Sequence, residues 1–229
     1  MSHLALIIPA AGSGKRMKSR LPKPYMKIAG DPVLKHTLLC FQNLPDLKQV
    51  VISTAAEYTS EALKIAKRVF PNLAVSCVTG GSKRQDSIQK ALSSIESSVE
   101  YVIVHDAVRP FVEHLSIEKC LETAKISGAA ILSIPARDTI KVADKKRIVQ
   151  STPDRRTVWQ AQTPQIFKKE ILDRAYAYAK STGYIGTDDA SLVEHLGENV
   201  TLVEGSYKNF KITYPADMKY AELLITGEN

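Results

Sequence analysis

Residues 4–17 read LALIIPAAGSGKRM, a continuous apolar run that leads into small residues and then into Lys15 and Arg16. An uninterrupted apolar run is typical of a parallel strand covered on both faces, whereas a half-exposed strand would alternate. Ligands of open α/β sheets bind at the carboxyl ends of the strands, where small residues let backbone N–H groups approach a phosphate. The stretch therefore predicts a nucleotide-binding turn; a tight strand-to-helix turn without a ligand is the alternative.

Strand-like and helical segments alternate along the first two-thirds of the chain. Residues 4–9, 49–54, 74–78, 101–105 and 129–134 are mostly apolar and predict strands of one sheet. Helices are expected after the caps Asp31, Ser116 and Thr187, at 85–95 and 168–180, and after Pro215, with Gly128 ending the helix that Ser116 begins. This order predicts a Rossmann-like α/β fold, a mainly parallel twisted sheet flanked by helices.

The rhythm changes between residues 136 and 159, where two short strand-like pieces, 139–142 and 147–151, flank a polar turn at Asp144. No helical pattern separates the two pieces, which predicts a β-hairpin arm within a single domain of residues 1–229. Isolated hairpins are only marginally stable in water. We therefore expect the arm to pack against a second copy of the chain in a homodimer.

Composition narrows the class of protein. The chain is 44% hydrophobic and 24% charged, no apolar run reaches the length of a membrane span, and no secretory leader is recognisable. Its three cysteines form no Cys-x-x-Cys pair and are expected to be reduced. These features predict a soluble cytoplasmic protein that contacts no membrane.

The formal net charge of +7 points to anionic partners. The basic clusters are short and lack interleaved aromatic residues, so we expect a phosphate-rich small substrate and no nucleic acid. A nucleic-acid-binding module is the alternative, and a salt-titrated binding assay with RNA and DNA distinguishes the two.

Two familiar phosphate-binding loops do not fit residues 9–17. The dinucleotide fingerprint needs a third glycine where Met17 stands, which disfavours a nicotinamide-dependent oxidoreductase, and a Walker A loop needs glycine at Pro9 and serine or threonine at Arg16. Arg16 and Lys23, the latter between two prolines, would instead place two cations beside a bound triphosphate. Transfer at an α-phosphate depends on positioning and charge stabilisation, so both are predicted catalytic residues.

This loop, together with Lys23, resembles the signature of sugar nucleotidyltransferases and, among them, of the 2-C-methyl-D-erythritol 4-phosphate cytidylyltransferase family. The similarity continues in the family's order through GGSKRQDS (80–87), VHDAVRP (104–110), ARDTIK (136–141), WQAQTPQ (159–165), TDDAS (187–191) and NFKIT (209–213). The resemblance implies Mg²⁺-dependent transfer of CMP from CTP to 2-C-methyl-D-erythritol 4-phosphate, with release of pyrophosphate, in the non-mevalonate isoprenoid pathway. A ribitol-5-phosphate cytidylyltransferase is the alternative among enzymes.

The resemblance also implies roles for individual residues. Nucleotide binding is expected from Ala10, Ala11, Gly12, Gly14, Lys23, Gly81, Ser87 and Asp106. Acceptor binding is expected from Arg109, Thr139, Arg155, Thr163, Thr187 and Lys211, with Thr139 and Arg155 reaching the neighbouring subunit's site. Asp106 follows a buried strand and should emerge beside the glycine-rich loop, where one carboxylate with phosphate oxygens and water suffices to hold Mg²⁺. Helix capping is the alternative for Thr187, and His105 is expected to be a packed side chain.

Overall fold

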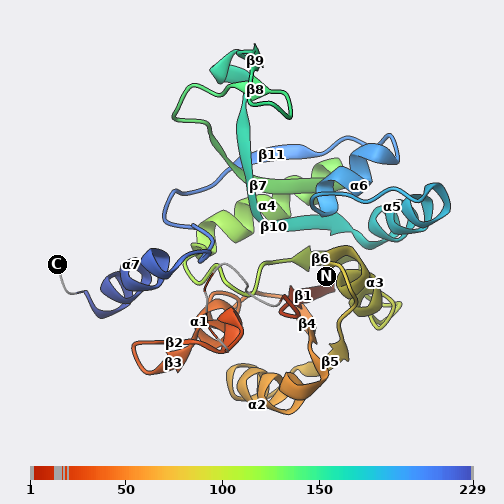
Figure 1. The fold of residues 1–229 in the computed structure, drawn as a ribbon. Coiled ribbons are helices and arrows are strands. Elements are labelled where there is room, and N and C mark those ends of the chain that lie inside the picture. Colours follow the sequence, from red (N-terminus) through yellow and green to blue (C-terminus); the bar gives the residue numbers. More distant parts are fainter. Residues whose placement is uncertain (1–2, 13–16, 18, 20, 228–229) are drawn as a thin grey trace.

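A seven-stranded sheet forms the centre of the computed structural model, which describes residues 3–12, 17, 19 and 21–227 (Figure 1). The strand order is β11-β7-β10-β6-β1-β4-β5. The strands are β1 (Leu4–Pro9), β4 (Leu47–Thr54), β5 (Ala74–Thr79), β6 (Tyr101–Val104), β7 (Ala129–Pro135), β10 (Trp159–Lys168) and β11 (Thr201–Glu204). β10 is antiparallel to β6 and β7, whereas the other neighbours pair in parallel. The predicted mainly parallel sheet is confirmed.

Helices cover both faces of this sheet. One face carries α1 (Val33–Leu39), α2 (Thr59–Val69) and α4 (His114–Ser127), and the other carries α3 (Arg84–Leu92), α5 (Lys169–Thr182) and α6 (Asp189–His195). Successive side chains of a strand point to opposite faces. In β1, Leu6 and Ile8 accordingly join the first core and Ala5 and Ile7 the second. A strand buried on both faces has no polar positions to alternate, which is why its sequence is continuously apolar.

A third, smaller cluster holds the C-terminal helix. α7 (Pro215–Thr226) lies against a two-stranded hairpin of β2 (Lys27–Ile28) and β3 (Asp31–Pro32), and its Ala221 belongs to one hydrophobic cluster with Ile28 and Val33. The chain also has two short 3₁₀ helices: η2 (Lys23–Tyr25) precedes β2, and η3 (Ala56–Tyr58) lies between β4 and α2. None of the helices in the described part of the chain has the length and apolar content needed to cross a membrane.

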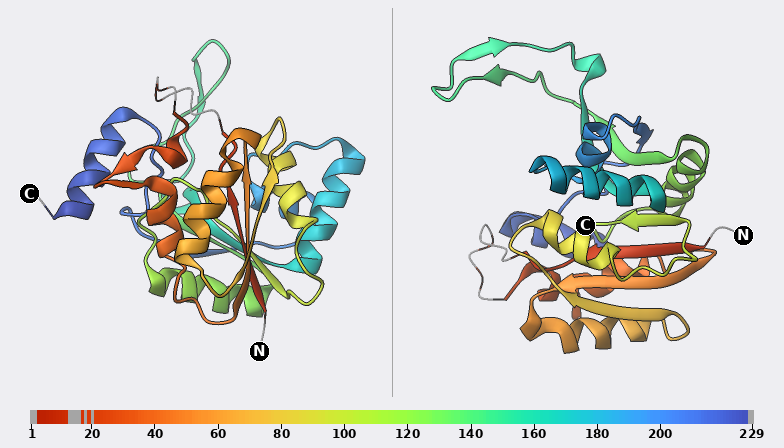
Figure 2. Two further views of the ribbon diagram at one scale, coloured as in Figure 1. Left: turned by 90° about the horizontal axis from the view of Figure 1, so that it is seen from below. Right: turned by 90° about the vertical axis from the view of Figure 1, so that its right-hand side faces the viewer.

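The predicted β-hairpin arm is present and extends well beyond the body, on the side where the parallel strands end (Figure 2). β8 (Val142–Ala143) pairs antiparallel with β9 (Val149–Ser151), and η4 (Arg155–Thr157) leads back into β10. Asp144 shapes the turn, because its Oδ1 accepts hydrogen bonds from the backbone N–H groups of Lys146 and Ile148, each at 2.9 Å. The strands are shorter and start later than predicted.

The five predicted strands are all present, with ends that differ by at most two residues. β10, β11 and α2 were not predicted. Residues 159–165 of β10 include three glutamines, a threonine and a proline, so they carry no apolar signal. In β11 only Val203 is buried. Both strands are held by pairing with distant neighbours, a contribution that local pattern does not reveal.

Three predicted helix caps are wrong. Asp31 lies in β3 and binds Lys35 at 2.6 Å, and Ser116 lies inside α4, whose N-cap is Glu113. Thr187 lies one residue too early. The cap of α6 is Asp188, whose carboxylate accepts a hydrogen bond from the Ser191 N–H at 3.0 Å. α1 and α4 begin after Pro32 and Glu113 without a side-chain cap, and at α6 the backbone places Asp188 rather than Thr187 at the cap.

The helix end at Gly128 was predicted correctly. Gly128 follows α4 with a φ of 82°, in the left-handed region that glycine tolerates best. Its N–H donates to the Ala124 carbonyl at 2.7 Å and closes the last turn. The following residue then begins β7, so this glycine sets the short return from helix to sheet.

Candidate active site

A cavity of about 370 Å³ opens at the carboxyl ends of β1 and β6. It is lined by seven of the residues predicted to bind the nucleotide: Ala10, Ala11, Gly12, Lys23, Gly81, Ser87 and Asp106. Gly14 and Arg16, predicted for nucleotide binding and catalysis, lie outside the described residues. The charged side chains in the described lining are Lys23, Arg84, Lys211 and Asp106, so cations outnumber carboxylates by three to one. The cavity therefore suits an anion.

The glycine pair after β5 packs closely against the small-residue loop after β1. A Cβ at Gly80 would lie 2.4 Å from the Cβ of Ala11, and one at Gly81 would lie 2.3 Å from the Cβ of Asp86. Ser87 holds this turn, because its Oγ accepts from the Gly81 N–H at 2.9 Å and donates to the Lys83 carbonyl at 3.0 Å. Side chains are excluded from this side of the cavity, which leaves backbone groups to meet a ligand.

Lys23 reaches the cavity from η2 and is only 9% exposed. Its ammonium group donates to the Ile212 carbonyl at 3.1 Å, close to the segment that carries Lys211. Tyr25 anchors this turn to the body: its ring stacks on Tyr58 with centroids 4.5 Å apart, and its hydroxyl lies 2.5 Å from the Thr54 hydroxyl at the end of β4. The lysine between two prolines is therefore a buried, supported cation rather than a solvated loop residue.

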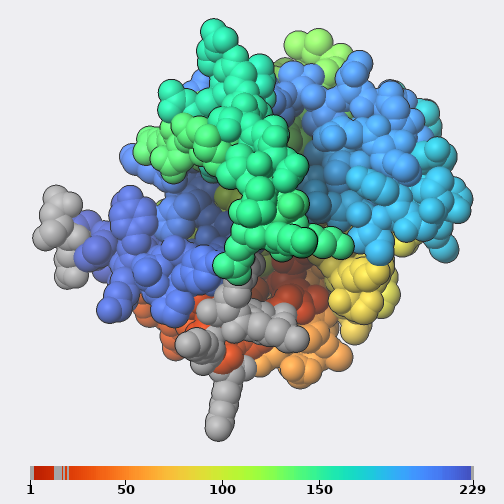
Figure 3. Space-filling view, turned by 45° about the horizontal axis from the view of Figure 1, so that its top comes forward, coloured from red at the N-terminus to blue at the C-terminus, as the bar shows by residue number. Residues whose placement is uncertain are grey.

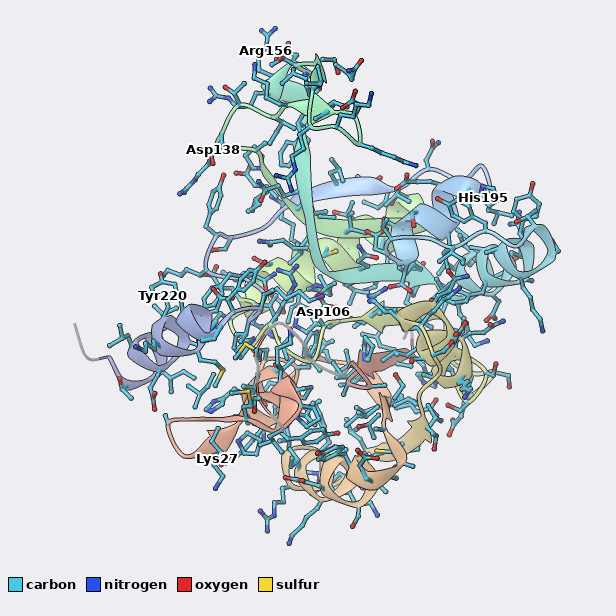
Figure 4. The ribbon with its side chains drawn as sticks, viewed as in Figure 1. Lys27, Asp106, Asp138, Arg156, His195 and Tyr220 are labelled. Carbon is cyan, nitrogen blue, oxygen red and sulfur yellow. The ribbon has the colours of Figure 1, made fainter. Side chains whose placement is uncertain are left out.

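Asp106 lies at the centre of the molecule, where β6 ends (Figure 4). Its Oδ2 is 3.0 Å from Lys211 Nζ and 3.1 Å from Arg109 Nε, and its Oδ1 is 3.8 Å from Arg84 Nε. Burial alone would raise the pKa of this carboxyl group, but Lys211, Arg84 and Arg109 together hold the pKa well below its usual range. Asp106 is thus a permanent anion that gathers three cations.

Arg109 joins the two chain segments that supply this cluster. While its Nε binds Asp106, its Nη1 donates to the Asn209 carbonyl at 2.7 Å, two residues before Lys211. The Asn209 side chain in turn donates to the Thr163 carbonyl at 2.8 Å. The end of β6, the middle of β10 and the segment after β11 are therefore fixed to one another by hydrogen bonds.

A second cavity, of about 270 Å³, adjoins the first. Arg84, Asp106 and Lys211 line both cavities, and we call these three residues the shared wall. Four of the predicted acceptor-binding residues line the smaller cavity: Arg109, Thr163, Thr187 and Lys211. Polar side chains that we had not singled out also line it, namely Gln162, Gln165 and Asp188.

The other two predicted acceptor-binding residues, Thr139 and Arg155, lie in the exposed connections of the arm and line neither cavity. Arg155 donates to the Arg137 carbonyl at 2.8 Å, a contact within the base of the arm. Figure 3 shows the arm (green) standing forward of the body, between α7 and the α5–α6 pair. Within one chain, these two residues are not brought together with the shared wall.

His105 is fully buried and packed, as expected. Its Nε2 is 3.0 Å from the Arg109 carbonyl, an oxygen that can only accept, so we assign the proton to Nε2. Nδ1 is then an acceptor for the Thr163 hydroxyl at 3.0 Å, and burial lowers the pKa of His105 to about 4. Thr163 Oγ1 also accepts from the Asp106 N–H at 3.0 Å. The Thr163 proton is therefore committed to His105, and the hydroxyl can offer a ligand only a lone pair.

Arg84 is the residue of the shared wall that sequence reasoning missed. It is the first residue of α3 and its side chain is 30% exposed. Its Nη1 lies 2.7 Å from Oδ2 of Asp189, a fully buried carboxylate at the start of α6. The sequence signal for Arg84 is a cation three residues after Gly81, within the GGSKRQDS motif of residues 80–87.

Known proteins resemble this chain over nearly its whole length. The sequence profile of the 2-C-methyl-D-erythritol 4-phosphate cytidylyltransferases matches residues 4–227. The chain belongs to this family. A family member from Bacillus velezensis is 42% identical over 226 residues, covering 98% of this chain and 96% of the relative, and one from Caldanaerobacter subterraneus subsp. tengcongensis is 39% identical over 224 residues, covering 97% and 99%.

Solved structures extend the family likeness to three dimensions. The crystal structure of 4-diphosphocytidyl-2C-methyl-D-erythritol synthase from Anaerococcus prevotii is similar with a TM-score of 0.88 at 28% identity, covering 98% of this chain and 96% of that one. Family membership thus rests on nearly the whole chain. The matched region, residues 4–227, contains the residues that line both cavities and the residues of the arm.

Proposed function

We propose that this chain transfers CMP from CTP to the phosphate of 2-C-methyl-D-erythritol 4-phosphate and releases pyrophosphate. One observation carries the proposal: two adjacent cavities share the wall of Arg84, Asp106 and Lys211. A nucleotide in the larger cavity and a phosphate monoester in the smaller one would meet at this wall. Direct transfer between two phosphates needs such a meeting point, because most of the catalysis lies in positioning and charge stabilisation.

The larger cavity supports the nucleotide assignment. Residues 10–12 and Gly81 present backbone rather than bulky side chains, and the cationic excess of the lining matches a triphosphate. The smaller cavity supports a polyol phosphate, since Lys211 can bind a phosphate group while Thr163 accepts a hydrogen bond from a hydroxyl group.

The proposed step is an in-line displacement. A lone pair on the acceptor's phosphate oxygen forms a bond to the α-phosphorus of CTP, and the bond from that phosphorus to the bridging oxygen breaks, so that pyrophosphate leaves with the electron pair. A phosphate monoester has a second pKa of about 6, so it is already a dianion near neutral pH and needs no general base. Lys23 and Lys211 stabilise the charge that develops, and Arg16 remains a predicted partner in this role.

Asp106 fits the role of a magnesium ligand. Its carboxylate stays ionised, and among the described residues Oδ1 contacts only Arg84, at 3.8 Å, which leaves this oxygen able to bind a cation. No group of three His, Cys, Asp or Glu side chains forms a metal cage among the described residues, so phosphate oxygens and water would complete the shell. When bound, Mg²⁺ would neutralise phosphate charge and orient the triphosphate.

The arm supports a homodimer in this proposal. Val142, Ile148 and Val149 are each about half exposed or more, on a hairpin whose two strands, among the described residues, pair only with each other. We propose that the arm covers the acceptor cavity of a second copy and brings Thr139 and Arg155 to it. The cysteines in the described residues are all free, which suits the reducing cytoplasm.

Pyrophosphate release tests the proposed reaction. The chain is incubated with each of the four ribonucleoside triphosphates against 2-C-methyl-D-erythritol 4-phosphate, ribitol 5-phosphate and erythritol 4-phosphate. CTP with 2-C-methyl-D-erythritol 4-phosphate is expected to give the highest kcat/KM. A preference for ribitol 5-phosphate would overturn the acceptor, and a preference for another nucleotide would overturn the cytidylyl assignment. Apo protein treated with a chelator and then restored with Mg²⁺ tests the metal.

A further inference from the structure

Three buried or half-buried groups from three helices form a chain of polar contacts behind the shared wall, one hydrogen bond followed by one ion pair. The Tyr176 hydroxyl of α5 donates to Asp189 Oδ1 at 2.6 Å, and Asp189 Oδ2, in α6, lies 2.7 Å from Arg84 Nη1 at the start of α3. Burial, and then the neighbouring Asp189 charge, raise the pKa of Tyr176 well above its usual value, so the phenol stays a donor. Arg84 is the end of this chain that reaches the cavities.

Burial of the Asp189 carboxylate is energetically unfavourable at this position. It is 0% exposed, and its neighbours Ala190 and Leu192 belong to the hydrophobic core on this face of the sheet. Burying a carboxylate costs several kcal/mol, and an ion pair recovers that cost only with good geometry. A well-packed apolar residue would stabilise the fold at least as well. The buried charge is therefore poorly explained by folding alone.

The start of α6 is held in place by Gln165 of β10. Its Oε1 accepts from the N–H groups of Asp189 and Ala190, each at 3.1 Å, while its Nε2 donates to Asp188 at 2.7 Å. The backbone of Asp189 is thus clamped to the strand that lines the smaller cavity. Its carboxylate is fixed before any ligand arrives.

Arg84 has a competing partner. Its Nε is 3.8 Å from Asp106 Oδ1, a longer contact than the 2.7 Å from its Nη1 to Asp189. With Asp189 neutral, Asp106 would be the remaining carboxylate within reach, and the guanidinium group would turn toward it. That movement would take the cation away from the ligand and cover the oxygen of Asp106 that is otherwise accessible.

We propose that Asp189, held by Tyr176 and Gln165, is a positioning residue that aims the Arg84 guanidinium group at the phosphates meeting at the shared wall. The inference rests on the proposed function, since it needs a phosphate in each cavity or at least a nucleotide in the larger one. Arg84 itself touches the substrate, and its planar fork suits two phosphate oxygens. Asp189 acts only through Arg84.

A double-mutant cycle tests this coupling. Asp189→Asn, Arg84→Ala and the double variant are compared with wild type by kcat/KM and by CTP affinity in calorimetry without acceptor. Each single change is expected to lower kcat/KM by about 10- to 100-fold, the range for a charge-assisted hydrogen bond. The double variant should be no worse than Arg84→Ala, because Asp189 then has nothing left to position.

Two controls keep the test informative. Asp173→Asn removes a carboxylate of α5 that binds Lys169 at the same 2.7 Å and lines neither cavity, so its kcat/KM should equal that of wild type. Tyr176→Phe keeps the charge of Asp189 and removes one hydrogen bond, so a loss of about fivefold is expected even if Asp189→Asn folds poorly. Thermal melting of each variant identifies misfolded protein.

The outcomes separate the two proposals. Independent, additive losses in the double variant would mean that Asp189 acts on folding alone, and wild-type values for Asp189→Asn and Tyr176→Phe would likewise overturn the positioning role. A wild-type chain that binds CTP but transfers to no acceptor would contradict the proposed reaction, while the CTP affinities would still decide the coupling. A wild-type chain that binds no CTP would overturn both.

Discussion

The shared wall and the arm both carry charged residues, but the charges of the wall are held by other parts of the chain and those of the arm are exposed. At the shared wall, Asp106 and its cations are held by hydrogen bonds from several distant segments. On the arm, every residue from 141 to 152 is exposed, and Arg155 contacts only the base of the arm among the described residues. The shared wall is complete within one chain. The two strands of the arm, among the described residues, pair only with each other and with no strand of the body. We therefore expect a substitution at the shared wall to impair the active site of the subunit that carries it. A substitution on the arm should instead impair the partner's active site or the association of the two subunits.

The largest effect is expected from Lys23. Replacing it with alanine removes a buried cation beside the proposed triphosphate, and kcat should fall by about 10²- to 10³-fold, the scale of losing one preorganised charge-stabilising group. Pyrophosphate release measures the effect. Lys27→Ala, an exposed lysine of β2 outside both cavities, is the matched control and should keep wild-type turnover. Near-normal turnover of Lys23→Ala would remove this residue from the chemistry.

The next effect is on folding. Asp106→Asn leaves Arg84, Arg109 and Lys211 without their common anion, and breaking a buried ion pair in this way should lower the free energy of unfolding by about 3 kcal/mol. Urea denaturation at pH 7 without metal measures it. Asp31→Asn, which breaks the exposed pair with Lys35, should cost less than about 0.5 kcal/mol. Equal losses of unfolding free energy would mean that the ion pairs of the shared wall stabilise the fold no more than an exposed ion pair does.

A smaller effect on activity is expected from the arm. Arg155→Ala should raise the KM for the acceptor by about tenfold and leave that for CTP unchanged, because a single phosphate-binding cation is lost from one side. Mixing this variant with Lys23→Ala sharpens the comparison. If the arm serves the partner, a mixed dimer regains one intact site. Random mixing of equal amounts should then restore about a quarter of the wild-type activity at acceptor concentrations well below the KM, where Arg155→Ala alone retains about a tenth. No recovery after verified subunit exchange would mean that the arm serves its own body.

The smallest effect is on the stability of the single chain. Ile148→Ser with Val149→Ser changes two exposed residues of the arm, so the free energy of unfolding measured at concentrations where the chain is monomeric should change by less than about 0.5 kcal/mol. Light scattering at micromolar concentration should instead report a shift from dimer toward monomer. A monomeric mass for the wild-type chain would remove the dimer from the proposal.

Much of the body could be predicted from sequence because its signals are local. The apolar run of residues 4–9 predicts a strand buried on both faces, and the position of Asp106 after another such run predicts a carboxylate at the same edge of the sheet. The arm was predictable from the loss of helical pattern. The exact caps were not, because neighbouring residues such as Thr187 and Asp188 compete and the backbone decides between them.

The shared wall itself could not be read from local pattern. Arg84 and Asp189, like Asp106 and Lys211, stand far apart in the chain, and they meet only because β10 runs antiparallel between β6 and β7 and brings α5 and α6 beside α3. Thr163 shows the same limit: its sequence offers a hydroxyl group, but its hydrogen bond to His105 decides that it accepts rather than donates.

By itself, the sequence determined the class of fold, the small-residue turn and the family, because strand burial, turn chemistry and motif order are properties of neighbouring residues. Only the tertiary structure decided which charges meet and in what state they are held. The pKa of Asp106 depends on three cations from three segments, and the direction of Arg84 depends on a buried carboxylate from a fourth. Such interactions arise between distant residues after packing has excluded water, so no local pattern encodes them.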